Sequence, residues 1–159
     1  MPTASSIRID DSLWPLRVVR FVGATTPEQF DHYLEGAAAC LRRGEKFISI
    51  LDLTRGVPTP ELRQRQAEWI QKHDALLREC QLGVAFVIIS PLMRLALSAI
   101  FYFKAMPVPY VVTAQLSEAA LWAISRLEAE GLVREAERLR HHFGLTTPLS
   151  VDQDPAPHA

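Results

Sequence analysis

Short apolar segments alternate with longer amphipathic segments along most of the chain. The short segments are rich in β-branched and aromatic residues, which favour strands, and we expect strands at residues 6–9, 16–22, 47–53, 84–89 and 108–113. Asp10, Asp11 and Pro15 supply turn residues between the first two segments, which therefore predict an antiparallel hairpin.

The amphipathic segments predict helices, and three of these helices have a clear start. A hydroxyl residue followed by proline stands at Thr26, Thr59 and Ser90. The hydroxyl oxygen can accept a free backbone N–H at the N-cap, and proline suits the first turn of a helix. We expect the helix after Thr59 to continue as one element to Cys80. A helical region near the carboxyl end, with an expected break at Gly131, completes the pattern.

The element order is ββαβαβαβα. This order predicts an α/β fold with a mostly parallel, mixed sheet of about five strands and four or five helices. The chain of 159 residues fits a single domain, which we place at residues 1–145. Residues 146–159 carry three prolines and no hydrophobic periodicity, so we expect a flexible C-terminal tail.

Two of the strand segments have a distinctive ending. Residues 47–54 read Phe-Ile-Ser-Ile-Leu-Asp-Leu-Thr, and residues 84–91 read Val-Ala-Phe-Val-Ile-Ile-Ser-Pro, followed by the basic residue Arg94. Over roughly residues 16–130 the pattern resembles the STAS domain family, which includes anti-sigma-factor antagonists and small bacterial STAS/SEC14-like proteins. The resemblance implies a STAS-like fold and a regulatory, protein-binding role in the cytoplasm of a bacterium.

The loop before the second helix departs from this family. STAS antagonists carry a phosphorylatable Ser or Thr there, in an Asp-Ser-Ser-Gly type motif. Residues 56–61 of this chain read Gly-Val-Pro-Thr-Pro-Glu, in which Thr59 is the one hydroxyl and suits an N-cap. The resemblance therefore implies the fold without the phosphorylation switch.

Composition and charge narrow the classes of function. Apolar residues make up 48% of the chain, which is typical of a globular domain. A net charge of −1 does not argue for nucleic-acid binding, which needs a clustered basic surface. No apolar run is long enough to span a bilayer, and residues 1–11 lack the basic and apolar regions of a signal peptide. Cys40 and Cys80 form no CxxC pair, so we expect reduced, buried thiols and a cytoplasmic protein, while a disulfide between them stays open.

Polar residues follow two of the predicted strands. Arg55 and Thr59 come after one central strand, and Ser90 and Arg94 come after the next. Because the carboxyl ends of parallel strands and the starts of the following helices meet at one edge of a sheet, these four residues could hold an anion or a phosphorylated partner. The alternative is that Asp52 pairs with one of the arginines and that the hydroxyls only cap helices.

Familiar catalytic and metal-binding motifs are absent from the sequence. It contains no HExxH, GxSxG or GxxxxGK[ST] pattern. His141 and His142 are adjacent, so on a helix they face different directions and do not form the i, i+4 pair of a helical metal site. We therefore expect a protein that is not an enzyme, with no catalytic residue, no cofactor and no metal.

The segment at residues 91–106 is unusual because it is apolar most of the way round. Arg94, Ser98 and Lys104 are its strongly polar residues. One apolar stripe suffices to cover a core, and Leu92, Leu95, Ala96, Ala99 and Phe103 can supply it. A second apolar face, suited to a partner, then contains Met93, Leu97, Ile100 and Phe101. Either the C-terminal helix or another chain could cover this segment, and we favour a second copy in a homodimer.

These observations lead to two functional hypotheses. The first is a non-enzymatic, STAS-like interaction module that docks on a partner through residues 91–106 and the adjacent strand-end loops. The second is a small-molecule or lipid carrier with an apolar pocket under the same helix. A cavity beneath that helix favours the carrier. The sequence does not identify the protein partner or the ligand.

Overall fold

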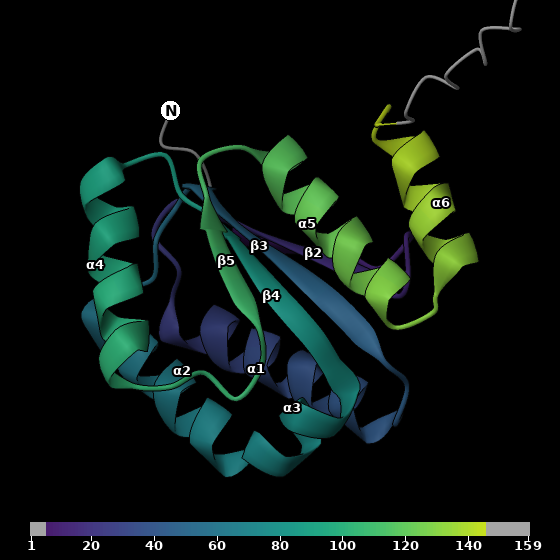
Figure 1. Ribbon diagram of the computed structural model, residues 1–159. Helices are drawn as coiled ribbons and strands as arrows, with labels where there is room; N and C mark the ends of the chain where they lie inside the picture. Colours follow the sequence, from purple (N-terminus) through teal and green to yellow (C-terminus); the bar gives the residue numbers. More distant parts are fainter. Residues whose placement is uncertain (1–5, 146–159) are drawn as a thin grey trace, which may run out of the picture.

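A mixed β-sheet of five strands runs through the middle of the protein in the computed structural model, which describes residues 6–145 (Figure 1). The strands lie side by side in chain order: β1 (Ser6–Asp10), β2 (Leu16–Val22), β3 (Phe47–Arg55), β4 (Gln81–Val87) and β5 (Tyr110–Thr113). β1 and β2 form the expected antiparallel hairpin, and β2 to β5 are parallel. The prediction of a mostly parallel, mixed sheet is confirmed.

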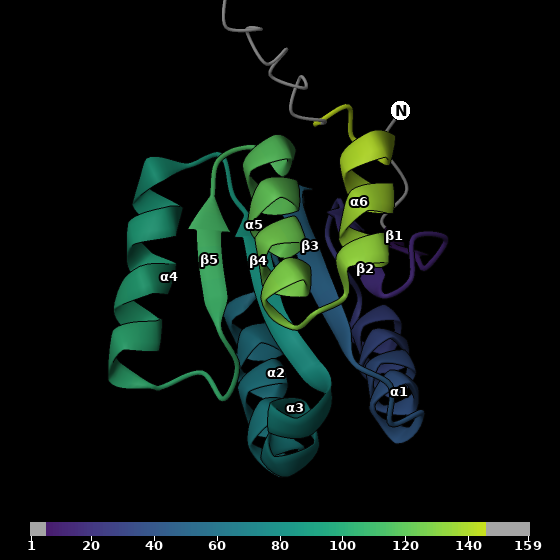
Figure 2. The same cartoon turned by 45° about the vertical axis from the view of Figure 1, so that its right-hand side comes forward.

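Helices cover both faces of this sheet (Figure 2). In the described part of the chain they are α1 (Pro27–Arg42), α2 (Pro60–Lys72), α3 (Asp74–Cys80), α4 (Pro91–Phe103), α5 (Leu116–Ala129) and α6 (Val133–His142). α1 to α4 pack on one face, and α5 and α6 pack on the other. Parallel crossovers are right-handed and the strand order never reverses, so every crossover helix falls on the same face.

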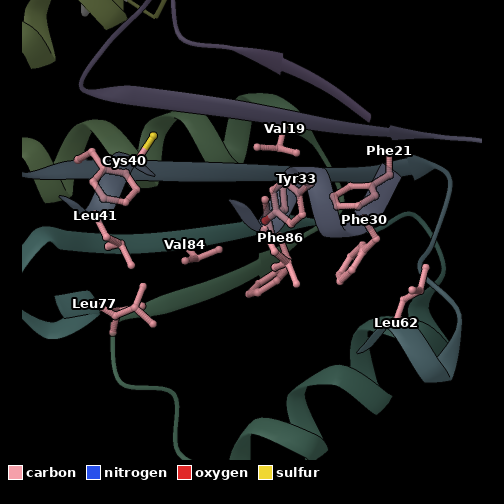
Figure 3. Packing of buried hydrophobic residues seen from close by; sticks show 14 of the residues in the cluster. Val19, Phe21, Phe30, Tyr33, Cys40, Leu41, Leu62, Leu77, Val84 and Phe86 are labelled. Atoms are coloured by element: carbon pink, nitrogen blue, oxygen red, sulfur yellow. The ribbon is translucent and has the colours of Figure 1, made fainter. Parts of the chain in front are cut away.

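Side chains along the strands alternate between two apolar layers. Val19 and Phe21 of β2 face the layer under α1 to α3, whereas Val18 faces the layer under α5 and α6. In the first layer the ring of Phe21 lies 5.5 Å from that of Tyr33 and 6.4 Å from that of Phe30, between ring centroids (Figure 3). The central strands are thus buried on both faces, which explains their continuous apolar sequence.

The three predicted helix starts are confirmed. The hydroxyl of Thr26 accepts the N–H of Gln29 at 3.2 Å, and the Gln29 side chain accepts the N–H of Thr26 at 3.0 Å, which completes a capping box. The hydroxyls of Thr59 and Ser90 each accept the N–H of the third residue after them at 3.3 Å. These caps begin α1, α2 and α4, so local sequence alone places three of the helices.

The helix expected from Thr59 to Cys80 is divided into α2 and α3 at His73. The backbone of His73 departs from helical geometry, with φ −106° and ψ 16°. Its ring stacks on Trp69 with 4.4 Å between ring centroids, and its Nδ1 lies 2.9 Å from the Trp69 carbonyl oxygen. This division raises the number of helices in residues 6–145 to six. The predicted break at Gly131, which has φ 80°, is confirmed and separates α5 from α6.

Gly83 of β4 lies directly against Trp122 of α5, and we predict that Gly83→Ala is destabilising. An added Cβ would lie 2.5 Å from Cη2 of Trp122 and 3.1 Å from the carbonyl oxygen of Pro109. The Trp122 ring would have to move, so we expect a loss of about 1–3 kcal/mol in the free energy of unfolding, measured by urea denaturation.

The control is Gly36→Ala in the interior of α1. A Cβ there meets Nη2 of Arg17 at 3.4 Å, an ordinary contact. Because alanine favours a helix over glycine, we expect a gain of about 0.5–1 kcal/mol. If both variants shift stability alike, α5 does not pack on β4 as closely as described.

Candidate functional site

α4 carries large apolar side chains on the side that faces away from the sheet. Leu92 is 76% exposed, Leu95 is 68% exposed and Tyr102 is 85% exposed. None of the described side chains of α4 is fully buried, whereas each of the other helices in residues 6–145 buries at least one. α4 is therefore the helix with the least cover.

The rotation of α4 is the reverse of the predicted one. Met93, Leu97 and Phe101 pack against the core, whereas Leu92 and Leu95 point outward. The expectation that Leu92 and Leu95 belong to the core stripe is therefore wrong. The following contacts explain the observed rotation.

Aromatic packing and one arginine fix α4 in this orientation. The Phe101 ring centroid lies 5.4 Å from that of Phe86 on β4 and 4.7 Å from that of Tyr110 on β5. At the other end of the helix, Nη1 of Arg94 donates to the carbonyl oxygens of Ile88 at 2.9 Å and Ile89 at 2.6 Å. The guanidinium thus ties α4 to the end of the preceding strand.

The C-terminal helix does not cover α4, which corrects that alternative. Ala136 and Leu139 of α6 pack into the apolar layer on the opposite face of the sheet, beside Ile124 of α5. Figure 2 shows α5 and α6 on the other side of the sheet from α2 and α3. Within residues 6–145, nothing lies over the outer face of α4.

A groove of about 150 Å³ separates α4 from α2. Met93, Leu97, Ile100 and Phe101 all line its α4 side, so the structure brings the four predicted partner-binding residues together. Ala67 and Ile70 of α2 lie on the other side, and the sheet supplies Phe86 and Ile88 as a floor. Arg63 and Gln66 are its polar lining residues. These four α4 residues thus face a groove in the protein, and their role in binding a partner stays a prediction.

The residues of the predicted anion site have other roles in the structure. Thr59 and Ser90 cap helices, and Arg94 binds backbone carbonyls of its own connection. Arg55 lines a separate hollow of about 290 Å³ beside β1 and β2. The stated alternative, that the hydroxyls cap helices, is what the structure shows, and anion binding by these residues stays a prediction.

Arg55 shares its hollow with Arg8 and Arg20. Asp52, the one carboxylate there, lies 3.7 Å from Nε of Arg20, and its other oxygen accepts the hydroxyl of Thr54 at 2.7 Å. Asp52 therefore pairs with Arg20 rather than with Arg55 or Arg94.

Comparison with known proteins identifies the fold. No protein-family model matches the sequence, and no curated protein matches it. Among solved structures, an uncharacterised protein of the DUF3478 family from Shewanella loihica PV-4, described as having a SpoIIAA-like fold, matches with a TM-score of 0.59 and 16% sequence identity. The match covers 77% of this chain and 98% of that one. The fold is SpoIIAA-like. This is the STAS, or anti-sigma-factor antagonist, fold, so the predicted resemblance is confirmed at the level of fold.

The SpoIIAA-like core also contains a polar cluster that the sequence analysis missed. Arg17 of β2 is only 4% exposed and lines a cavity of about 60 Å³ between the sheet and α1 to α3. Tyr33, Ser49, Gln66 and Gln81 line the same cavity. A signal was available, because strand alternation places Arg17 on the same face as Val19 and Phe21. Apolar residues alone define the predicted strands, so they do not reveal this inward cation.

Other candidate chemistry in this SpoIIAA-like domain is sparse. Cys40 and Cys80 are separate buried thiols, which confirms that expectation, and burial raises the pKa of the Cys80 thiol. Within residues 6–145, no three His, Cys, Asp or Glu side chains come close enough to hold a metal ion. No helix in that range has both the length and the apolar character needed to cross a membrane.

Two leucines on opposite sides of α4 test its rotation, and we predict different effects of the same substitution. Leu97→Ala removes contacts with the core, so we expect a loss of about 1–3 kcal/mol in the free energy of unfolding. Leu95→Ala, at a position that is 68% exposed, should change it by less than about 0.5 kcal/mol. Chemical denaturation measures both, and a larger loss in Leu95→Ala would contradict this orientation.

Proposed function

We propose that this SpoIIAA-like chain is a non-enzymatic interaction module that pairs with a second copy of itself through the outer face of α4. The observation that carries the proposal is the exposure of Leu92 and Leu95, at 76% and 68%, on the least covered helix. Large apolar side chains gathered on one exposed face mark interaction surfaces, because their burial removes apolar area from water.

The charge of α4 supports a second copy as the occupant. Arg94 is the one charged residue between Pro91 and Phe103, and its guanidinium is turned onto backbone carbonyls. In a symmetric dimer each face meets its own copy, so a charge close to the two-fold axis would meet the same charge across it. A face without charge avoids this repulsion and suits self-association.

The proposed role of the assembly follows from the fold. The STAS fold supports a regulatory module that works by binding another protein in the cytoplasm of a bacterium. The solved structure with the same fold is described as uncharacterised, so it adds no partner. Because the second copy occupies the outer face of α4 in the proposed dimer, the strand-end loops next to α4 are the proposed docking surface for that partner.

The dimer is tested by placing charges on the outer face of α4. We expect the unmodified chain to sediment as a dimer and the double variant Leu92→Asp, Leu95→Asp to sediment as a monomer. Burying carboxylates without partners is costly, so the dimer dissociation constant should rise at least about a hundredfold. Sedimentation velocity over a concentration series measures it.

Val133→Asp is the matched control, because Val133 is 59% exposed and lies on α6, on the other face of the sheet. It should leave the dimer intact. A monomer at all concentrations for the unmodified chain, or a dimer that survives in the double variant, would exclude α4 as the interface.

A second candidate function is the binding of a small apolar ligand, and the groove between α2 and α4 favours it. An apolar cavity of about 150 Å³ can hold a molecule of the size of benzene. The groove has this volume and is lined mainly by apolar side chains, with Arg63 and Gln66 as polar exceptions. Since it is not fully enclosed, a longer alkyl chain can extend along it.

Filling the groove tests this second function. We expect 1-octanol to bind the unmodified chain saturably, seen as shifts of the methyl resonances of Met93 and Ile70 in NMR spectra. Ala67→Phe places a ring in the groove and should weaken binding about tenfold or more. Ala129→Phe, at an exposed position at the end of α5, is the control and should bind normally. Equal binding by both variants would place the alcohol elsewhere.

A further inference from the structure

Arg17 is a cation enclosed in the apolar layer between the sheet and α1. It lies on β2 next to Val19 in that layer and is only 4% exposed. A guanidinium stays protonated at any physiological pH. Its burial therefore costs free energy unless a negative group compensates the charge.

The described contacts of Arg17 compensate this charge only in part. Nη1 donates to Sγ of Cys40 at 3.1 Å, and a thiol sulfur is a weak acceptor. Nε lies 3.5 Å from Oδ1 of Asp11, whose side chain is 47% exposed, and this buried Nε has no hydrogen-bond partner in residues 6–145. A water molecule could accept a hydrogen bond from Nε without neutralising the charge, whereas an anionic oxygen would do both.

The space beside Arg17 is a small cavity with several polar groups in its wall. Its volume is about 60 Å³, and Tyr33, Ser49, Gln66 and Gln81 line it together with Arg17. Nε2 of Gln81 donates to the hydroxyl of Ser49 at 3.1 Å. Burial raises the pKa of Tyr33, so the phenol keeps its proton at neutral pH. The rest of the wall is mainly apolar, and one buried cation with a few neutral polar groups in such a wall suits a small anionic head group.

The cavity at Arg17 borders the apolar groove beneath α4. Leu51, Gln66, Ile70 and Phe86 line both spaces, so the two lie next to each other over the same face of the sheet. Both are lined mainly by apolar side chains, and the buried cation Arg17 lines the smaller one.

We infer that the two spaces together bind one amphiphile, with a carboxylate head at Arg17 and an alkyl chain in the groove under α4. The inference rests on the proposed ligand-binding function and adds the chemical class of the ligand. A space of about 60 Å³ excludes a bulky head group, and the neighbouring groove of about 150 Å³ takes hydrocarbon. Medium-chain fatty acids are the simplest compounds with this form.

Octanoate and 1-octanol test the inference on the unmodified full chain. They have the same alkyl chain length and differ in the charge of the head group. Without a cation in the site, octanoate would bind more weakly than the alcohol, because its carboxylate would lose hydration. With Arg17 as the partner, we expect octanoate to bind about tenfold tighter by isothermal titration calorimetry at neutral pH.

Variants then locate the head group. Arg17→Gln should bring octanoate to the affinity of 1-octanol and leave the alcohol unaffected, and Arg17→Lys should restore part of the preference. Arg134→Gln removes an exposed charge from α6, on the other face of the sheet, and should bind like the unmodified chain. If Arg17→Gln fails to fold, Arg63→Gln decides which arginine binds the head group, because the preference for octanoate should survive in that variant.

The outcomes separate the inference from the function on which it rests. If 1-octanol binds as tightly as octanoate or more tightly, the groove takes apolar ligands and the head-group site at Arg17 is excluded. If neither compound binds, both the ligand-binding function and the inference fail. If Arg63→Gln removes the preference for octanoate and Arg17→Gln does not, the head group lies at Arg63 in the groove and the inference is overturned.

Discussion

The handedness of the crossovers between parallel strands decides where every helix of this protein lies. The strand order from β2 to β5 never reverses, so right-handed connections place α1 to α4 on one face of the sheet. The opposite face is left to α5 and α6, which follow the last strand. α4 is consequently the last helix in its row, with α2 on one side and no helix of residues 6–145 on the other. The groove and the exposed apolar face both result from this position.

The sequence predicts the parts of the fold that are set by contacts between residues close together in the chain. The caps at Thr26, Thr59 and Ser90 are made within four residues, and the break at Gly131 needs only the freedom of glycine at φ 80°. The positions of the central strands follow from apolar runs that are buried on both faces. The division of the second helix at His73 could not be predicted in this way, since the apolar pattern continues through it and the stacking on Trp69 is visible only in three dimensions.

The structure brings the four predicted side chains of α4 together, but it turns the helix the other way from the prediction. Met93, Leu97, Ile100 and Phe101 do come together, but in a groove rather than on an outward face. A helix with apolar side chains all round has no unique inward stripe, so its periodicity cannot set its rotation. Tertiary contacts set it instead, through the packing of Phe101 on Phe86. Arg17 shows the opposite case, in which strand alternation does place the side chain inside but gives no reason for a cation there.

The way in which α4 is held explains why a groove remains beneath it. Its amino end is fixed by directional contacts, the Ser90 cap and the hydrogen bonds from Arg94 to the end of β4. Along its length it is held mainly by apolar packing, which has no preferred direction and tolerates a range of helix positions. The close aromatic contacts are at Phe101, near the far end, so the helix is anchored at both ends and spans the space between them. α4 therefore presents two apolar surfaces at once, and whatever fills the groove or covers the outer face acts on the same helix.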